Sequence, residues 1–283
     1  METVETVAAL RACVANWKKA NQKTVLIPTM GNLHSGHLSL VNHARQLADK
    51  VIVSIFVNPM QFDDSHDLTA YPRTLEVDLE KLTGVQCDLV FIPNAALMYP
   101  IGMDSQTSVM VPGNDDILCG LDRLGHFTGV ATVVLKLFNM TQTDIAVFGE
   151  KDYQQLLLIK KMVTDLDIPV VISGVETFRE ADGLAMSSRN QYLTEDERQR
   201  AAGLYRTLTE LREEILSGKH NFIQLQQQAM IRLKNRGFEP DYIEVRRSSD
   251  LRLAQKMDTE LRILAAARLG SARLIDNIDC NLA

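Results

Sequence analysis

Two histidines three residues apart lie in a glycine-containing segment near the start of the chain. The segment runs from Pro28 to His37 and contains His34, Gly31 and Gly36. Glycine permits a sharp turn and a close approach of a ligand to the backbone, and the start of a helix attracts anions. Histidine side chains placed there can donate hydrogen bonds to phosphate oxygens. The alternatives are a plain loop with solvated histidines and a metal site, although no third metal ligand is evident nearby in the sequence.

Two further segments carry side chains that suit phosphate. Lys151 is a point charge in the segment Gly-Glu-Lys-Asp, whose acidic members Glu150 and Asp152 could instead simply favour the start of a helix. Residues 186–190 offer two hydroxyls and Arg189, which can surround the oxygens of a polyphosphate. Alone, each could be an ordinary loop. Together with the histidines, they resemble the paired signatures of class I aminoacyl-tRNA synthetases and related nucleotidyltransferases, which hold ATP for attack at its α-phosphorus.

The elements that must position these segments alternate between short apolar strands and amphipathic helices. Runs rich in β-branched residues predict buried parallel strands at Thr24–Pro28, Val51–Val57, Asp88–Ile92, Asp144–Phe148 and Val170–Val175. Helices are predicted at His37–Ala48, Thr74–Leu82 and Tyr153–Leu166. This alternation is typical of an α/β fold with a doubly wound, mostly parallel, Rossmann-like sheet. Such sheets bind ligands at the carboxyl ends of their strands, where both the histidine and the lysine segments lie.

The pattern changes after about residue 175. Helices are predicted at Thr194–Leu216, which begins with a capping box, and at Phe222–Asn235. Strand-like segments follow at Tyr242–Arg246, Glu260–Leu269 and Ala272–Ile278. The second of them could equally be a helix, but the Gly270-Ser271 pair favours a hairpin. We therefore expect a Rossmann-like domain over residues 1–175, and a smaller α+β domain with helices and a short antiparallel sheet over residues 176–283.

Composition and charge exclude several classes of protein. The 283 residues include 30 Lys+Arg and 36 Asp+Glu, and the net charge of −6 argues against extended contact with nucleic acid. The longest strongly apolar run, Val51–Val57, is far shorter than the ~20 residues that span a bilayer, and no signal-peptide core begins the chain. The four cysteines are scattered without a Cys-x-x-Cys pair, which favours reduced thiols in a cytoplasmic protein.

The match to a known family rests on seven strings in register. They are IPTMGNLHSGH, VSIFVNPMQF, YPRTLEVD, GHFTGVATVV, FGEKDYQQL, DGLAMSSRN and ARLIDN. In order and spacing they resemble the pantoate–β-alanine ligase (pantothenate synthetase) family over essentially the whole chain. The resemblance implies a homodimeric enzyme that couples (R)-pantoate to β-alanine with ATP and Mg²⁺ through a pantoyl adenylate, giving pantothenate, AMP and pyrophosphate. The N-terminal domain would then bind both the nucleotide and pantoate.

The resemblance also implies the roles of individual residues. Catalytic roles fall on His37, His34, Lys151 and Arg189. The ATP contacts would be Met30, Gly31, Asn32, Leu33, His34, Ser35, Gly36, His37, Gly149, Glu150, Lys151, Asp152, Phe178, Met186, Ser187, Ser188 and Arg189. Pantoate would contact Gln61 and Gln155, and β-alanine would also contact Gln61. No protein ligand of a metal is assigned.

The chain departs from the family pattern at two positions. Cys119 stands where glutamate is usual, and Leu124 stands where proline is usual. A glutamate at position 119 could pair with Arg123 four residues later if that stretch is helical. We therefore expect Arg123 to be less constrained in this chain.

Three other functions share some of these features. They are a class I tRNA synthetase, a nucleotidyltransferase that keeps the nucleotide in its product, and a non-enzymatic ATP-binding module. The excess of acidic over basic residues argues against a class I tRNA synthetase. The environment of Gln61 and Gln155 argues against a nucleotidyltransferase that keeps the nucleotide in its product, but only through the family resemblance. Three separated phosphate-handling loops are more than binding alone needs.

Overall fold

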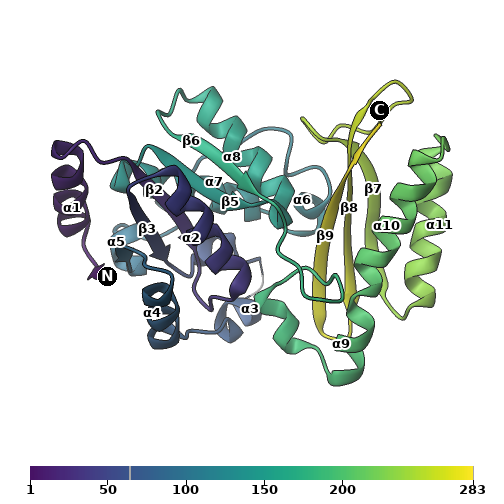
Figure 1. Ribbon diagram of the computed structural model, residues 1–283, viewed down its shortest axis with the longest axis horizontal. Helices are drawn as coiled ribbons and strands as arrows, with labels where there is room; N and C mark the ends of the chain where they lie inside the picture. The colour runs from purple at the N-terminus through teal and green to yellow at the C-terminus, as the bar shows by residue number, and fades with distance from the viewer. Residues whose placement is uncertain (64, 283) are drawn as a thin grey trace. The chain divides into compact units, whose positions relative to one another are not determined.

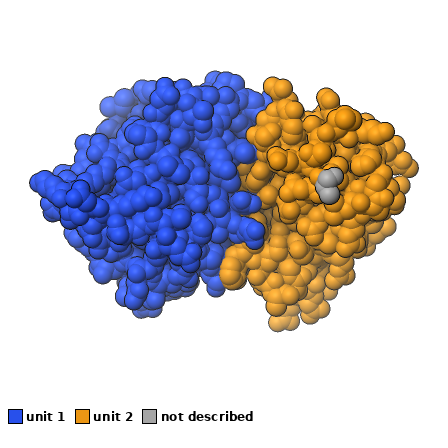
Figure 2. All heavy atoms as spheres, turned by 45° about the horizontal axis from the view of Figure 1, so that its top comes forward, with its two compact units in different colours: residues 1–150, 154–176 blue, residues 151–153, 177–283 orange. Residues whose placement is uncertain are grey.

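The computed structural model describes residues 1–63 and 65–282, which fold into two compact units. Unit 1 comprises residues 1–150 and 154–176, and unit 2 comprises residues 151–153 and 177–283 (Figure 2). Lys151–Tyr153 thus groups with unit 2 although the chain on either side of it belongs to unit 1.

Unit 1 is built on a six-stranded parallel sheet (Figure 1). Its strands are β1 (Glu2–Val4), β2 (Thr24–Thr29), β3 (Lys50–Ile55), β4 (Leu89–Phe91), β5 (Ile145–Gly149) and β6 (Val171–Val175), in the order β1-β4-β3-β2-β5-β6. The inner strands are apolar on both faces because both faces are covered. Val25 and Ile27 pack with Val41 and Ala44 on one face, while Phe148 contacts Phe138 on the other.

Helices cover this sheet. They are α1 (Val7–Lys19), α2 (Ser35–Leu47), α3 (Ser65–Ala70), α4 (Leu75–Gly84), α5 (Ala95–Met98), α6 (Cys119–Asp122), α7 (His126–Thr141) and α8 (Tyr153–Asp165), with short 3-10 turns η1 (Pro59–Gln61) and η2 (Glu150–Asp152). The face that carries Val25 and Ile27 packs against α2 and against Leu82 of α4. Phe138 places α7 on the opposite face. These contacts make unit 1 a three-layered α/β structure.

Unit 2 contains an antiparallel sheet in the order β7-β8-β9. Its elements are η3 (Ser188–Tyr192), α9 (Glu195–Ala201), α10 (Gly203–Leu216), α11 (Phe222–Asn235), β7 (Glu239–Arg247), β8 (Glu260–Leu269) and β9 (Ala272–Asn281). One face of the sheet packs on α10 and α11 through a core that includes Leu208, Leu211, Ala229, Ile263 and Leu274. Figure 1 shows α10 and α11 running beside the three strands.

The predicted fold class is confirmed, as is the predicted hairpin, and the structure differs from the predicted elements in two places. Glu260–Leu269 is a strand, and Leu269 pairs with Ala272 across the predicted hairpin. The single helix predicted at Thr194–Leu216 is wrong: it divides into α9 and α10 at Ala202. Gly203, a poor helix former, follows the break and packs closely on Arg236 and Phe238. The short β1 and helix α1 were not predicted.

Within the described residues, every helix is too short or too polar to cross a lipid bilayer.

Candidate active site

The predicted histidine segment leaves the sheet at its topological switch point. Strand β2 has β3 and β4 on one side and β5 and β6 on the other, so the strand order reverses beside it. Doubly wound sheets bind ligands at the carboxyl ends of the strands at this point. The carboxyl end of β2 leads to Met30–His37, that of β3 to Asn58–Gln61, and that of β5 to Glu150. Three predicted segments of unit 1 therefore start from neighbouring strands.

His34 and His37 lie together at the start of α2. His34 is the N-cap and His37 is the third residue of the helix, and their ring centroids are 4.1 Å apart with an interplanar angle of 38°. The backbone N–H of His34 donates to Nδ1 of His37 at 3.4 Å. A neutral imidazole that accepts at Nδ1 carries its proton on Nε2. The pair thus stands at the positive end of the α2 dipole, where anions are favoured.

Asp78, at the start of α4, shapes the turn that precedes these histidines. Its carboxylate accepts the backbone N–H of Asn32 at 2.8 Å and that of Leu33 at 2.7 Å. Lys81, one turn further along α4, donates to the carbonyl of Leu33 at 2.6 Å. The side chain of Asp78 is buried, with 1% of the residue exposed. Helix α4 therefore binds both N–H groups and a carbonyl group of the turn, through Asp78 and Lys81.

Gly31 is required in this turn by both conformation and space. Its φ is +80°, in the region that L side chains rarely adopt. A Cβ atom at this position would lie 3.1 Å from Oδ2 of Asp78 and 3.1 Å from a methyl group of Ile55. The turn can approach the Asp78 carboxylate closely because residue 31 has no side chain.

Gln61, at the end of η1, reaches the histidine segment. Its Nε2 donates to Sδ of Met30 at 2.8 Å, and its Oε1 accepts from Nδ2 of Asn58 at 3.1 Å. Oδ1 of Asn58 in turn accepts the hydroxyl of Tyr99 at 2.6 Å. This chain of hydrogen bonds orients the Gln61 amide, because each donor already faces an acceptor.

The backbone of Gln61 is held from α7 and the loop before it. Its carbonyl oxygen lies 2.7 Å from Nδ1 of His126 and accepts from Nη2 of Arg123 at 3.3 Å. Nη1 of Arg123 lies 3.1 Å from Nε2 of His126. Arginine can only donate, so His126 is neutral with its proton on Nδ1. Gly129 lets α7 approach this segment, since a Cβ there would lie 2.2 Å from the carbonyl oxygen of Met60.

We expected Arg123 to be less constrained in this chain, but its guanidinium has several partners. Besides His126 and Gln61, its guanidinium binds Asp63, with 3.1 Å between Nε and Oδ1. The pairing was missed because Asp63 lies 60 residues away in the sequence. Burial raises the pKa of the Asp63 carboxyl, but the charge of Arg123 and the hydrogen bonds to the carboxylate together hold that pKa below its usual value.

The loop around Cys119 is fixed by Gln154 of α8. The backbone N–H of Cys119 donates to Oε1 of Gln154 at 3.2 Å. Nε2 of Gln154 donates to the carbonyls of Asn114 and Ile117, each at 3.0 Å. The other departure from the family pattern, Leu124, is 80% exposed. A buried amide from another helix therefore holds the Cys119 backbone, while Asp63 supplies the carboxylate partner of Arg123 that we had assigned to a glutamate at position 119.

The next residue of α8, Gln155, is half-buried. Gly149 ends β5, and Glu150 begins η2. A Cβ at Gly149 would meet only Leu40, at 3.9 Å, so this glycine is not tightly packed.

Unit 2 carries the other predicted ATP segments. Residues 178–186 fold back on themselves: Arg179 and Ala185 form an antiparallel bridge, and the N–H of Met186 donates to the carbonyl of Phe178 at 3.0 Å. The hydroxyl of Ser187 accepts the N–H of Arg189 at 3.3 Å and caps η3. The Met-Ser-Ser-Arg segment therefore starts from a closed turn.

Lys151 also belongs to unit 2. Its Nζ lies 3.7 Å from Oδ1 of Asp152, and 18% of its side chain is exposed. Its backbone carbonyl accepts from Nδ2 of Asn277 at 2.8 Å.

The sequence and structure of the chain were compared with those of known proteins. The family model described as pantoate-beta-alanine ligase matches residues 2–279. The chain belongs to the pantoate–β-alanine ligase family. It is 53% identical to pantothenate synthetase of Shewanella loihica over 278 residues, which are 98% of each chain. It is 51% identical to pantothenate synthetase of Azotobacter vinelandii over 283 residues, all of both chains.

Solved structures of this ligase family have the same fold. Pantothenate synthetase of Thermus thermophilus superposes with a TM-score of 0.92 at 42% identity, covering 99% of this chain and 100% of the other. Pantoate-beta-alanine ligase of Francisella tularensis, crystallised with beta-gamma ATP and beta-alanine, superposes with a TM-score of 0.80 at 34% identity and covers 98% and 97% of the two chains. Membership of this ligase family makes the chain an enzyme.

Several side chains that shape the site of this ligase were missed as functional residues. Asp78 lies in one of the family strings and Asn58 lies in another, but neither was among the predicted site residues. The feature that marks both residues is a charged or amide side chain that is almost completely buried: Asp78 and Asn58 are each only 1% exposed. A buried polar group must find partners, and here those partners are the turn and Gln61.

Proposed function

We propose that this ligase condenses (R)-pantoate with β-alanine in an ATP-dependent reaction through a pantoyl adenylate. The pantoate carboxylate attacks the α-phosphorus of ATP, and pyrophosphate leaves with the electron pair of the broken P–O bond. The neutral amine of β-alanine then attacks the acyl carbon, AMP leaves, and the new amide loses a proton. The observation that carries the proposal is the adjacent pair His34 and His37 at the start of α2, with Gln61 bound to the same segment.

The first step needs positioning and charge neutralisation rather than a base. Pantoate is already ionised at pH 7, so nothing has to remove a proton before it attacks. The transferred group is instead held in line, and its developing charge is stabilised by fixed donors. We assign this catalytic role to His34, His37, Lys151 and Arg189. In this assignment Nε2 of His37 is the ring donor, because its Nδ1 accepts from the backbone.

We assign ATP to the same residues that the family resemblance implies. They are Met30, Gly31, Asn32, Leu33, His34, Ser35, Gly36, His37, Gly149, Glu150, Lys151, Asp152, Phe178, Met186, Ser187, Ser188 and Arg189. The assignment at Phe178 concerns its backbone, whose carbonyl already accepts the N–H of Met186.

We assign pantoate to Gln61 and Gln155, and β-alanine to Gln61. An amide side chain can bind a hydroxyl and a carboxylate without adding charge. The Gln61 amide suits this role because Asn58 and Tyr99 fix its orientation. A pre-oriented group loses less conformational entropy when the substrate binds. The Francisella tularensis relative, crystallised with beta-gamma ATP and beta-alanine, supports these substrate classes.

Magnesium fits this site as a companion of ATP. Across residues 1–63 and 65–282, no group of three or more His, Cys, Asp or Glu side chains is placed to hold a metal ion. Mg²⁺ commonly binds through substrate phosphates and water with at most one or two carboxylates. When bound, it supplies further neutralisation of phosphate charge.

Isotope exchange tests the adenylation step. With pantoate and Mg²⁺ present and β-alanine absent, labelled pyrophosphate should enter ATP. Omitting pantoate should abolish this exchange, which controls for hydrolysis of ATP. Exchange that requires tRNA, or a product that retains the nucleotide after β-alanine is added, would replace the proposal with one of the two related functions.

We also propose that the enzyme is a cytoplasmic homodimer. The family resemblance supports the dimer, and the free thiols of Cys13, Cys87 and Cys280 suit a reducing compartment. Light scattering coupled to gel filtration should give twice the chain mass of 31.7 kDa.

A further inference from the structure

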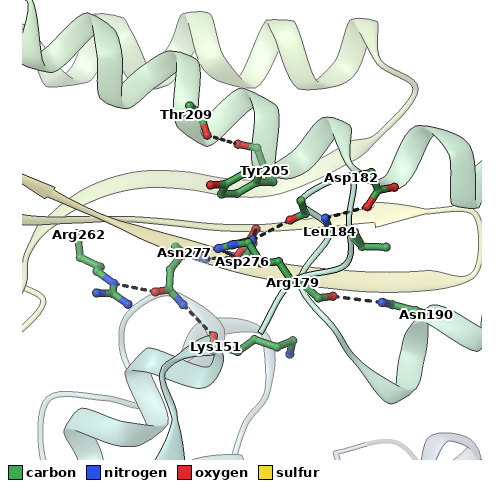
Figure 3. A network of polar contacts seen from close by, with 12 residues as sticks. Lys151, Arg179, Asp182, Leu184, Asn190, Tyr205, Thr209, Arg262, Asp276 and Asn277 are labelled. Atoms are coloured by element: carbon green, nitrogen blue, oxygen red, sulfur yellow. Dashed lines mark hydrogen bonds and ion pairs between the residues drawn. The ribbon is translucent and has the colours of Figure 1, made fainter. Parts of the chain in front are cut away.

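Asn277 of β9 binds the backbone of Lys151 across 126 residues of sequence. Its Nδ2 donates to the Lys151 carbonyl at 2.8 Å, and its Oδ1 accepts from Nε of Arg262 at 2.7 Å (Figure 3). Asn277 is 3% exposed. The amide is fixed from both ends, because a flipped amide would turn its oxygen toward a carbonyl and its NH₂ toward a guanidinium.

Arg262 holds the same segment at a second point. Its guanidinium carbon lies 4.0 Å from the ring centroid of Tyr153, two residues after Lys151. The Tyr153 hydroxyl donates to the carbonyl of Ser248 at 3.1 Å. Residues 151–153 are therefore held through a backbone carbonyl, an aromatic face and a hydroxyl. This explains why they group with unit 2 rather than with the chain on either side.

The neighbouring residue Asp276 holds the base of the other phosphate segment. Its carboxylate binds both Nη atoms of Arg179, at 2.7 and 2.9 Å. Arg179 also donates to the carbonyl of Gly183 at 3.0 Å and stacks on Tyr205, 3.9 Å from the ring centroid. Arg179 opens the turn that closes at Met186.

The two residues use opposite faces of one strand. Side chains of successive strand residues point to opposite faces. Asp276 has the same parity as Leu274 and Ile278, which pack in the core beneath α10 and α11. Asn277 therefore points to the other face, with Arg262. Strand β9 is in this way the common support of both segments.

We propose that Asn277 is a positioning residue, which fixes Lys151 relative to the turn that carries Met186–Arg189 and so sets the spacing of two phosphate-binding groups. The inference rests on the proposed function, since it requires Lys151 to act on ATP. Asn277 acts only through the Lys151 backbone and not on the substrate. A displacement of about 1 Å in such a group can lower a rate by on the order of 10²-fold.

A double-mutant cycle on the full-length enzyme tests the proposal. Asn277→Asp keeps the size of the side chain and the acceptor for Arg262, but it turns an oxygen toward the Lys151 carbonyl. We expect N277D to slow pantoate-dependent pyrophosphate exchange by on the order of 10–100-fold and to raise the KM for ATP, with the KM for pantoate unchanged. In a Lys151→Ala background, the same change should cost less than about twofold.

The matched control is Asn281→Asp, the same substitution at an exposed position of β9. It should behave as the parent does, and thermal unfolding should show that all variants are folded. If N277D does not fold, Asn277→Ala enters the same cycle, because it removes the amide donor without introducing a charge.

Each outcome of the cycle has one meaning. Loss of exchange in K151A and N277D, with little further loss in the double variant, supports the proposal. Equal fold losses from N277D in both backgrounds, or no loss in the parent background, overturn it while Lys151 keeps its assigned role. Full exchange in K151A instead removes Lys151 from the mechanism, and the proposed function of that residue fails first.

Discussion

Oδ1 of Asp78 accepts the backbone N–H of Leu33 at 2.7 Å, across 45 residues of sequence. Oδ2 of the same carboxylate accepts the N–H of Asn32 at 2.8 Å. Because His34 directly follows these two residues, its position at the start of α2 is set from α4. The histidine pair is therefore placed by a buried side chain of another helix as well as by its own.

Asp78→Asn should damage catalysis and stability together. An NH₂ group in place of one carboxylate oxygen faces a backbone N–H with another donor, so one of the two hydrogen bonds is lost. We expect unfolding free energy to fall by about 1–3 kcal/mol and pyrophosphate exchange to fall by on the order of 10–100-fold. Urea unfolding and isotope exchange measure these. Glu80→Gln, at an exposed position of α4, is the control. An unchanged exchange rate in D78N would show that the turn keeps its shape without both hydrogen bonds from the Asp78 carboxylate.

His37→Ala should lose catalysis with little loss of stability. The His37 ring accepts a long hydrogen bond from the N–H of His34, at 3.4 Å, as part of the cap of α2, and loss of a cap typically costs only ~1 kcal/mol. Loss of one transition-state donor typically costs ~10²–10³ in rate. Single-turnover formation of pyrophosphate gives this rate directly. His43→Ala removes another histidine from α2, one whose Nε2 lies 3.2 Å from Ser173, and it should react at the parental rate. Equal losses in the two variants would point to damage of the helix rather than to chemistry.

The sequence predicted those parts of the site that follow from local pattern. The strand runs placed His37 and Gln61 after parallel strands, and the carboxyl ends of such strands lie at one edge of the sheet. Contacts that depend on tertiary packing could not be predicted from the sequence. The bonds from Asp78 to Leu33, from Arg123 to Asp63 and from Asn277 to Lys151 join positions 45, 60 and 126 residues apart. Nothing in a linear pattern marks a residue such as Lys151 as belonging with a strand near the other end of the chain.

Gln61→Ala should weaken pantoate far more than ATP. The substitution removes the oriented amide and leaves Asn58 without one of its acceptors, a change that typically costs ~1–3 kcal/mol. Tyr99→Phe should reproduce part of this effect, at about 1 kcal/mol, because its hydroxyl donates to Asn58 at 2.6 Å. Burial raises the pKa of the Tyr99 hydroxyl, so it remains a donor at every working pH. Calorimetric titration with each ligand separates the two affinities; equal losses for pantoate and ATP would contradict the pantoate assignment.

The buried cysteines should be inert toward thiol reagents. Burial raises the pKa of the Cys87 and Cys280 thiols to about 11. At pH 8 only about one molecule in a thousand then carries a thiolate at either site, and the thiolate is the reactive form. Ellman's reagent should therefore label half-buried Cys13 first, and Cys13→Ser should abolish the fast phase. Urea should make the buried thiols react; rapid labelling of C13S without urea would mean that these thiols are open to solvent.

Asp63→Asn should change pantoate binding slightly and in a pH-independent way. Asp63 pairs with Arg123, which helps to hold the Gln61 carbonyl. The Asp63 side chain is 34% exposed, and a pair of this kind is worth ~0–1 kcal/mol. The KM for pantoate should therefore rise severalfold at most, while the KM for ATP stays at the parental value. Asp104→Asn, which removes one exposed charge elsewhere in unit 1, is the control.

The pH dependence of this effect follows from the sign of the pKa shift at Asp63. Burial raises that pKa, but the charge of Arg123 and the hydrogen bonds to the carboxylate together keep it below its usual value. A carboxyl with a depressed folded-state pKa contributes fully above its unfolded-state value of about 3.9, and loses the contribution as the pH falls through the lower folded-state value. The ratio of the pantoate KM in D63N to that of the parent should thus stay constant between pH 6 and 9. A ratio of one would show that Arg123 holds Gln61 without help from Asp63, and a ratio that varies over this range would contradict the lowered pKa of Asp63.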